Sequence, residues 1–216
     1  MANTNIGEVS IYYDDKEYLL RPSFKNIASI EDYNTVAGQV GLAVQSFMSV
    51  GAIHWTHVLP CWTVIQACAD EFVPAELIGE INEDLTITTG ALELYEVAAI
   101  ANGLMKWGLY GEPSDERKGY ARAMARTQKP DGSPVNIEQY FGIAVAPSGL
   151  GMSTTEAWNL TMREFQIAYD IQFPLTDKQK SMIPPPPEVE AKMMEQIRRA
   201  RERMKYMPKS PAKRLR

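Results

Sequence analysis

The sequence predicts a mainly α protein that opens with a β-hairpin, an α+β fold class. We expect a small helical bundle, then a second short helical unit, and then a C-terminal basic helix. Apolar residues alternate singly near the N-terminus and recur every three to four residues over much of the remaining chain. The 216 residues are 45% hydrophobic and 23% charged, an ordinary composition for a globular chain that buries a core.

The hairpin is predicted by alternation on either side of an acidic turn. Hydrophobic residues occupy alternate positions at Val9, Ile11 and Tyr13. Asp14 and Asp15 follow, and aspartate tolerates the dihedral angles of a tight turn. The chain is then expected to return through residues 17–20. Because an isolated two-stranded hairpin is marginally stable in water, this one should pack against helices.

Helices are expected from the hairpin to about residue 110. Ser23 can cap a helix over 24–33. Further apolar segments predict helices at about 35–49, 53–69 and 92–109. Pro60 has no backbone N–H and is expected to start or interrupt the second of these. Pro74 is expected in the first turn of a short helix, and Gly108 and Gly111 at the end of the long one.

Two capping boxes predict consecutive helices in the distal half of the chain. Ser153 with Glu156, and Thr161 with Glu164, have the spacing at which each side chain can bond the other's backbone N–H. The residues before them, 111–136, are rich in charged and turn-forming types, which predicts a linker with room for one short helix.

The C-terminal part is predicted to be a charged helix behind a proline run. Residues 184–187 are all proline and should form an extended spacer. The helix expected over 188–206 carries a narrow apolar stripe of Val189, Met193, Ile197 and Met204. The last ten residues should be disordered. The predicted organisation is a hairpin-plus-helical domain 1–110, a linker 111–136, a helical unit 137–174, a Pro-rich spacer 175–187, and a basic helix with its tail 188–216.

Charge is divided unevenly along the chain, although the net charge is −5. Residues 188–216 hold ten Lys or Arg and four Asp or Glu, whereas the preceding residues hold 12 and 23. An acidic body with a basic tail predicts a tail that meets an acidic partner, nucleic acid or its own body. Two cysteines and a start without a basic or apolar signal region predict a cytosolic protein without a disulfide scaffold.

The sequence offers one metal-like group and one uncharged stretch. His54, His57, Cys61 and Cys68 lack a Cys-x-x-Cys knuckle and lie among apolar residues, so packing is the better interpretation and no metal site is expected. Residues 33–69 contain no Asp, Glu, Lys or Arg, but polar side chains interrupt them throughout. We therefore expect core helices there and no membrane span.

Motifs typical of enzymes are missing from the sequence. It has no phosphate-binding loop, no His-Glu-x-x-His, no Gly-x-Ser-x-Gly elbow and no dinucleotide fingerprint. We expect a protein that is not an enzyme and uses no cofactor.

The basic helix allows three interpretations. In the first, the helix is a solvated charged surface with internal pairs such as Glu195 with Arg199. In the second, its Met/Ile stripe docks in a partner's groove with arginines on the rim. The third is contact between its arginines, Arg198 and Arg201 among them, and the phosphates of a nucleic acid.

Two segments carry a recognisable pattern. Tyr18-Leu-Leu-Arg-Pro-Ser-Phe-Lys-Asn-Ile-Ala-Ser-Ile-Glu31 follows a strand and an Asp-rich turn, and Gly149-Leu-Gly-Met-Ser-Thr-Thr-Glu-Ala-Trp-Asn-Leu-Thr-Met-Arg-Glu-Phe165 combines a Trp helix with a Thr-x-x-Glu helix. Both resemble tail assembly chaperones of long-tailed bacteriophages, a group that includes related proteins of gene transfer agents. The basic helix after the proline run is not part of that pattern.

The resemblance implies a non-enzymatic protein of the infected host's cytoplasm. It would bind the tape measure protein, keep it soluble during tail morphogenesis and help to recruit tail tube subunits. Methionine and aromatic side chains adapt to varied helical clients. The contact candidates are Trp158, Phe165, Phe173, Met193, Met194, Ile197, Met204 and Met207, with Arg198 and Arg201 beside them. Core packing is the preferred interpretation for Trp158 and Phe165.

Two other functions stay open. One is a virion structural protein, such as a head–tail connector or a tail-completion protein. The other is a nucleic-acid-binding adaptor that acts through the basic C-terminal helix.

Overall fold

A computed structural model describes residues 2–127, 134–185 and 187–205 of the chain. The chain divides into two compact units, of which unit 1 comprises residues 1–114 and 130–174 and unit 2 comprises residues 115–129 and 175–216. Within the described stretches, every helix is too short or too polar to cross a lipid bilayer.

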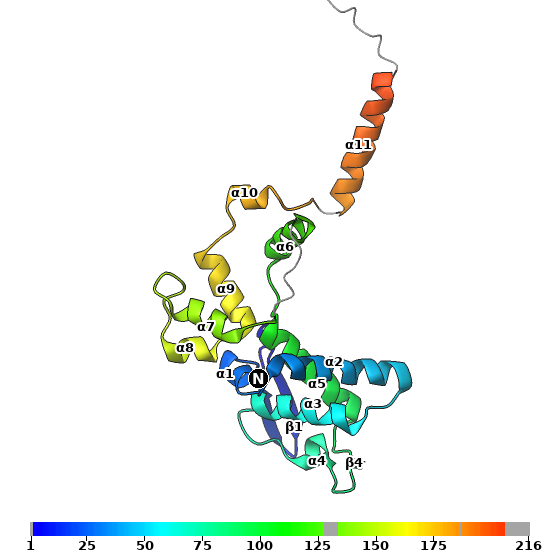
Figure 1. Cartoon of the computed structure of the whole chain (residues 1–216), viewed down its shortest axis with the longest axis vertical. Coiled ribbons are helices and arrows are strands. Elements are labelled where there is room, and N and C mark those ends of the chain that lie inside the picture. The colour runs from blue at the N-terminus through cyan, green and yellow to red at the C-terminus, as the bar shows by residue number, and fades with distance from the viewer. Residues whose placement is uncertain (1, 128–133, 186, 206–216) are drawn as a thin grey trace, which may run out of the picture. The chain divides into compact units, whose positions relative to one another are not determined.

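The predicted hairpin consists of β1 (Val9–Tyr13) and β2 (Lys16–Leu20), which pair antiparallel with Ile11 opposite Tyr18. The Asp14-Asp15 turn has φ angles of 49° and 58°, the left-handed conformation that a two-residue hairpin turn requires. Helices make up most of the described chain after it (Figure 1). The mainly α, α+β fold class is therefore confirmed.

The first half of unit 1 contains a short 3-10 helix, five α-helices and a second hairpin, whose strands are two residues long. The 3-10 helix is Thr4–Ile6, and the α-helices are α1 (Phe24–Ala28), α2 (Tyr33–Val50), α3 (Trp55–Cys68), α4 (Ala75–Ile78) and α5 (Leu94–Leu109). The second hairpin, which the sequence did not predict, is β3 (Glu80–Ile81) with β4 (Ile87–Thr88). Helices α2, α3 and α5 pack against one another (Figure 1).

Local boundaries differ from the prediction in three places. The helix expected over 24–33 ends at Ala28, because Asp32 takes a left-handed φ of 48° and caps α2 by accepting from the Thr35 N–H. Pro60 lies inside the continuous helix α3, so it neither starts nor interrupts that helix as predicted. Pro74 precedes α4 as its N-cap rather than standing in its first turn.

Gly108 lies inside α5 and does not end it. A Cβ added there would be 2.6 Å from Cγ1 of Ile27, so the missing side chain allows α1 and α5 to approach closely. The chain leaves the helix at Gly111, whose φ is +58°. One predicted helix stop was therefore a packing position instead.

The core of unit 1 forms where β2, α1, α3 and α5 meet. Leu20, Phe24, Ile65 and Leu104, one from each of these elements, are fully shielded from solvent. Their burial explains why the hairpin is stable here although it would be marginal alone.

The distal helices belong to the same core. They are α7 (Ile137–Val145), α8 (Thr154–Asn159) and α9 (Met162–Gln172), and both predicted capping boxes are formed. Ile137, Ala157 and Phe165 are buried in one cluster with the N-terminal residues. The structure thus differs from the predicted separation of 1–110 from 137–174, because the apolar sides of α7–α9 are covered by the N-terminal half.

Unit 2 contains α6 (Asp115–Thr127), α10 (Asp177–Lys180) and α11 (Pro187–Lys205). The predicted linker 111–136 therefore includes a 13-residue helix, and the predicted spacer 175–187 includes a short one. Lys180 and Glu116 pair at 3.7 Å, and a Cβ at Gly119 would lie 2.6 Å from Cγ2 of Ile183. The tail expected to be disordered, 207–216, lies outside the described residues.

Candidate partner-binding surface

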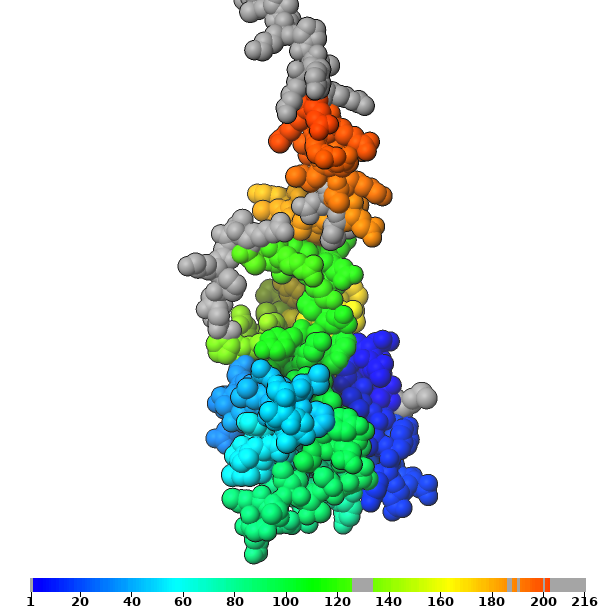
Figure 2. Space-filling view, turned by 90° about the vertical axis from the view of Figure 1, so that its right-hand side faces the viewer, coloured from blue at the N-terminus to red at the C-terminus, as the bar shows by residue number. Residues whose placement is uncertain are grey.

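Helix α11 presents an exposed apolar stripe, which we define as Val189, Met193 and Ile197. Their side chains are 45%, 49% and 43% exposed, and a spacing of four residues places them on one side of the helix. Met194, 61% exposed, borders the stripe. The residues of α11 are drawn in orange to red in Figure 2. Apolar groups this exposed on a charged helix are typical of an interaction surface.

Local sequence explains why α11 is a helix despite that exposure. Pro187 occupies its first position, and most of the residues that follow are strong helix formers. Glu195 binds Arg198 at 3.0 Å and Arg199 at 2.9 Å, one helical turn away. Hydrogen bonds from Arg199 and Arg198 lower the pKa of the Glu195 carboxyl. The predicted Glu195–Arg199 pair is present.

By sequence position, charged residues of both signs fall beside the stripe, and Glu190 is the nearest of them. At about 100° per residue, Lys192 and Arg201 lie on either side of the stripe. Glu195 and Glu202 project from the opposite side. The remaining predicted stripe member, Met204, belongs to α11, but its side chain and all of Met207 lie outside the described part of the structure.

The predicted aromatic contacts are placed differently. Phe165 is only 4% exposed, which confirms the preferred interpretation of core packing and removes this residue from the partner-contact candidates. Its ring lies 5.9 Å from that of Phe24 and 5.4 Å from that of Tyr140, between helices that share the core. Helical spacing of an apolar residue is compatible with either a core or an interface position, and Phe165 lies in the core.

Trp158 and Phe173 are half-buried. Trp158 stacks on Phe141 with ring centroids 4.1 Å apart, and Phe173 lies 4.9 Å from Tyr169. Both belong to unit 1, whereas the stripe, Met194, Arg198 and Arg201 share one helix of unit 2. The structure therefore gathers the α11 candidates on one element and leaves the aromatic ones in packing contacts.

His54, Cys61 and Cys68, in and next to α3, occupy capping or buried packing positions. His54 caps the helix, with its Nδ1 3.4 Å from the Thr56 backbone N, and the Cys61 thiol donates to the His57 carbonyl at 3.2 Å. Burial raises the pKa of Cys61 and of Cys68 to about 12, which keeps both thiols protonated near neutral pH. The described residues contain no cluster of three or more His, Cys, Asp or Glu that could hold a metal ion.

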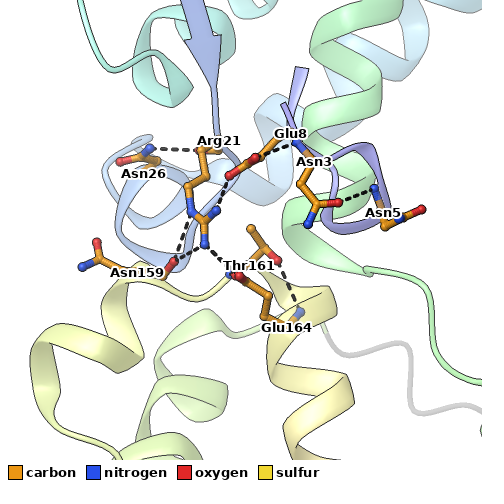
Figure 3. Close-up of polar contacts among 8 residues, drawn as sticks. All are labelled: Asn3, Asn5, Glu8, Arg21, Asn26, Asn159, Thr161 and Glu164. Carbon is orange, nitrogen blue, oxygen red and sulfur yellow. Dashed lines mark hydrogen bonds and ion pairs between the residues drawn. The ribbon is translucent and has the colours of Figure 1, made fainter. Parts of the chain in front are cut away.

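Arg21 is the centre of a polar cluster that joins residues 18–31 to residues 149–165 (Figure 3). Its guanidinium donates to both carboxylate oxygens of Glu164, at 2.7 and 3.0 Å, and to the Asn159 carbonyl at 3.1 Å. It also pairs with Glu8, whose other oxygen accepts from the Asn3 N–H at 2.8 Å.

The backbone continues this connection. Ser23 forms an antiparallel bridge with Thr161, and the Phe24 N–H donates to the Leu160 carbonyl at 2.8 Å. Thr161 is fully buried, and its N–H donates to Glu164. Each polar group in this cluster has a protein partner, so the cluster fastens α8 and α9 to the hairpin region of unit 1.

A second apolar surface, which the sequence did not predict, is a shallow groove of about 290 Å³ between α3, α4 and β3. Leu59, Trp62, Phe72 and Ile81 line it together with Glu80. The Trp62 indole donates to the Ile78 carbonyl at 2.8 Å, which holds the ring in place. Phe72, which directly follows Asp70 and Glu71 in the sequence and is 78% exposed in the structure, was the available sequence signal.

Comparison with known proteins gives one match, to a protein family. Searches of curated proteins and of solved structures found no match. A family model, described as a family of unknown function, DUF6246, matches residues 9–183. The match begins at the first residue of β1 and ends before the proline run, so α11 lies beyond it. Because it includes well over half of the 216 residues, the chain belongs to the DUF6246 family of unknown function.

Proposed function

We propose that this protein is a tail assembly chaperone of a long-tailed bacteriophage that binds the tape measure protein in the host cytoplasm and keeps it soluble. The observation that carries the proposal is the exposed apolar stripe of α11, formed by Val189, Met193 and Ile197. A tape measure protein is long and helical, and its own apolar stripes need cover before the tail is built. An amphipathic helix supplies such cover.

The small size of the stripe suits a temporary partner. Burying an exposed side chain of this kind contributes about 1.5–3 kcal/mol at most, and association itself costs several kcal/mol in lost freedom. Three half-exposed residues therefore support only weak binding by one chain. Several copies of the protein bound along one client would together cover more of its apolar surface. A chaperone that leaves before the tail is complete requires such reversible contacts.

The resemblance adds a second, independent line of support. Its two segments lie far apart in the sequence but share the Arg21–Glu164 contact and the Ser23–Thr161 bridge. The residues that carry the resemblance therefore lie together in one part of the structure.

The experiment is co-expression of the full chain with the tape measure protein of the same genome. We expect the tape measure protein to move from the pellet to the soluble fraction. Met193→Asp should return it to the pellet, because a carboxylate in the stripe opposes apolar contact. The matched control is Ala191→Asp, an exposed position on another side of the same helix, which should leave solubility unchanged. An unchanged pellet with the natural chain would contradict the proposal.

Mass spectrometry of purified particles tests the alternative of a virion structural protein. A chaperone that leaves the tail should be missing from mature particles. Detection at a fixed number of copies per particle would favour a head–tail connector or a tail-completion protein instead.

A further inference from the structure

We propose that the groove between α3, α4 and β3 is a second client-binding site, which takes an amphipathic helix with Lys or Arg beside its apolar residues. The helical nature of this client rests on the proposed function, whereas the site and the charge of the client come from the structure. The groove combines an apolar lining with free carboxylates, in a long part of the chain that has no basic residue.

The lining offers apolar and aromatic groups to a partner. Phe72 is 78% exposed and Leu59 is 52% exposed. The Trp62 ring is held by its hydrogen bond to the Ile78 carbonyl, so it loses little freedom when a partner binds. Fixed aromatic groups are typical of the residues that contribute most to binding. A shallow groove of about 290 Å³ suits side chains of a helix better than an enclosed small molecule.

The groove lies in a part of the chain without Lys or Arg. Residues 26–105 contain ten Asp or Glu and no Lys or Arg, and the residues that line the groove all fall within 59–81. Glu80 is the one Asp, Glu, Lys or Arg among those lining residues, and neither His54 nor His57 is among them. The sequence around the groove is therefore negative.

Two carboxylates at the groove are available to a partner. Glu80 of β3 lines it, and Glu76 lies in α4 between the lining residues Ala75 and Ile78. Both glutamates are exposed. Within the described part of the chain, neither carboxylate is held by a hydrogen bond or an ion pair. A cation brought by a partner would therefore displace only water from them.

Lys16 of β2 is the cation that the contacts place in this region. It pairs with Glu71, the residue before Phe72, and its Nζ lies 4.9 Å from the centre of the Tyr18 ring. Lys16 thus compensates one carboxylate and leaves Glu76 and Glu80 unpaired. The hairpin turn that carries it is itself negative, because Asp14 and Asp15 directly precede Lys16.

The same charges argue against other occupants. A nucleic acid or an anionic lipid surface would bring negative charge against the carboxylates. The same groove of a second copy would do so too. A helix without charged residues would cover the apolar lining but would give the carboxylates no partner. A helix with Lys or Arg beside its apolar residues satisfies both parts.

The test uses two fluorescein-labelled synthetic peptides of roughly 20 residues, with the same Leu/Ile face and either Lys or Glu at the flanking positions. Fluorescence anisotropy measures their binding to the full chain at low and moderate salt. We expect the Lys-flanked peptide to bind about tenfold more tightly, and the difference to shrink as salt rises. Equal binding of the two peptides would overturn the selection for a basic client.

Substitutions in the lining locate the site. Leu59→Asn and Phe72→Ser should each weaken the Lys-flanked peptide about tenfold, because they remove apolar contact without a change in charge. The matched control is Leu42→Asn in α2, since Leu42 is also 52% exposed, and it should keep the affinity. Circular dichroism should show that helix content is retained in all three. Binding that Met193→Asp removes and Leu59→Asn does not would assign the peptide to α11 and overturn the inference.

Neutralisation of the two free carboxylates tests the charge. Glu76→Gln combined with Glu80→Gln should reduce the preference for the Lys-flanked peptide about threefold. The control with the same change in net charge is Glu31→Gln combined with Glu202→Gln, at exposed positions outside the lining, which should keep the preference. Equal losses in the two pairs would show that only the overall charge of the chain matters.

The remaining outcomes separate this site from the proposed function. A tape measure protein that the natural chain and Leu59→Asn keep equally soluble, with peptide binding also unchanged by Leu59→Asn, would overturn the inference alone. Charge-selective binding in the groove with no effect on tape measure solubility would reject the proposed function and retain the site. Concentration-dependent dimers by light scattering, lost in Leu59→Asn, would assign the groove to a second copy and overturn the client.

Discussion

Arg21 and Glu164 are 143 residues apart in the sequence, yet both oxygens of the Glu164 carboxylate accept from the same Arg21 nitrogen, at 2.7 and 3.0 Å. Glu164 is also the third residue of α9, where it closes the capping box with Thr161. One carboxylate thus stabilises the start of a helix and fastens that helix to the end of the N-terminal hairpin.

Replacement of Arg21 by methionine should lower the stability of unit 1. The Glu8 side chain is only 9% exposed and would lose its cation, and leaving a largely buried carboxylate unpaired is costly. We expect a loss of about 2 kcal/mol in the free energy of unfolding, measured by urea denaturation. Lys16→Met, which breaks the exposed pair with Glu71, is the control and should change it by less than about 0.5 kcal/mol. Equal effects of the two would contradict the role given to Arg21.

The two capping boxes should differ in their contribution to stability. Thr161 is fully buried, whereas Ser153 is exposed. Thr161→Ala should cost about 1–2 kcal/mol and speed hydrogen exchange in the first turn of α9. Ser153→Ala should cost about 0.5–1 kcal/mol, with its effect confined to α8. Faster exchange at α9 in the Ser153 variant would argue that the two helices open together.

Two glycines of α5 should respond to alanine with opposite signs. At Gly108 a Cβ would lie 2.6 Å from Ile27, so Gly108→Ala should lower the melting temperature. At Gly103 no atom lies within 4 Å of an added Cβ, so Gly103→Ala should raise stability by up to about 1 kcal/mol through helix propensity. Ile27→Ala should offset part of the Gly108→Ala loss. If it does not, the close approach of α1 and α5 is not the cause.

The buried thiols should make stability depend on pH above neutrality. Burial raises the pKa of Cys61 and Cys68 from 9.0 to about 12 in the folded chain. The unfolded chain then loses these protons first, so stability is intact below pH 9 and falls as the pH rises towards 12. The slope approaches about 1.4 kcal/mol per pH unit for each thiol.

Denaturation of the natural chain and of Cys61→Ala/Cys68→Ala between pH 8 and 10.5 checks this dependence. The double variant should be less stable at pH 8 because it leaves cavities, but its stability should fall less steeply with pH. Identical slopes would show that other groups control the alkaline loss. Both thiols should also resist alkylation at pH 8 until the chain unfolds.

Parts of the candidate surface were predictable and parts were not. The spacing of Val189, Met193 and Ile197 predicted a stripe on one side of a helix, and the structure places them so. The same kind of spacing made Phe165 a contact candidate, although its ring is in the core. The groove beside Phe72 left no periodic pattern, because its lining comes from three elements.

What the sequence determined alone was local. The Asp14-Asp15 turn, the Ser23 cap and the capping boxes at Ser153 and Thr161 depend on groups within three or four residues of each other, so their spacing is enough to predict them. Only the tertiary structure decided that α7–α9 share a core with the hairpin, that Gly108 is a contact rather than a helix stop, and that Arg21 meets Glu164. Those outcomes depend on which surfaces pack together and exclude water. Contacts between residues so far apart in the sequence leave no local pattern from which they could be predicted.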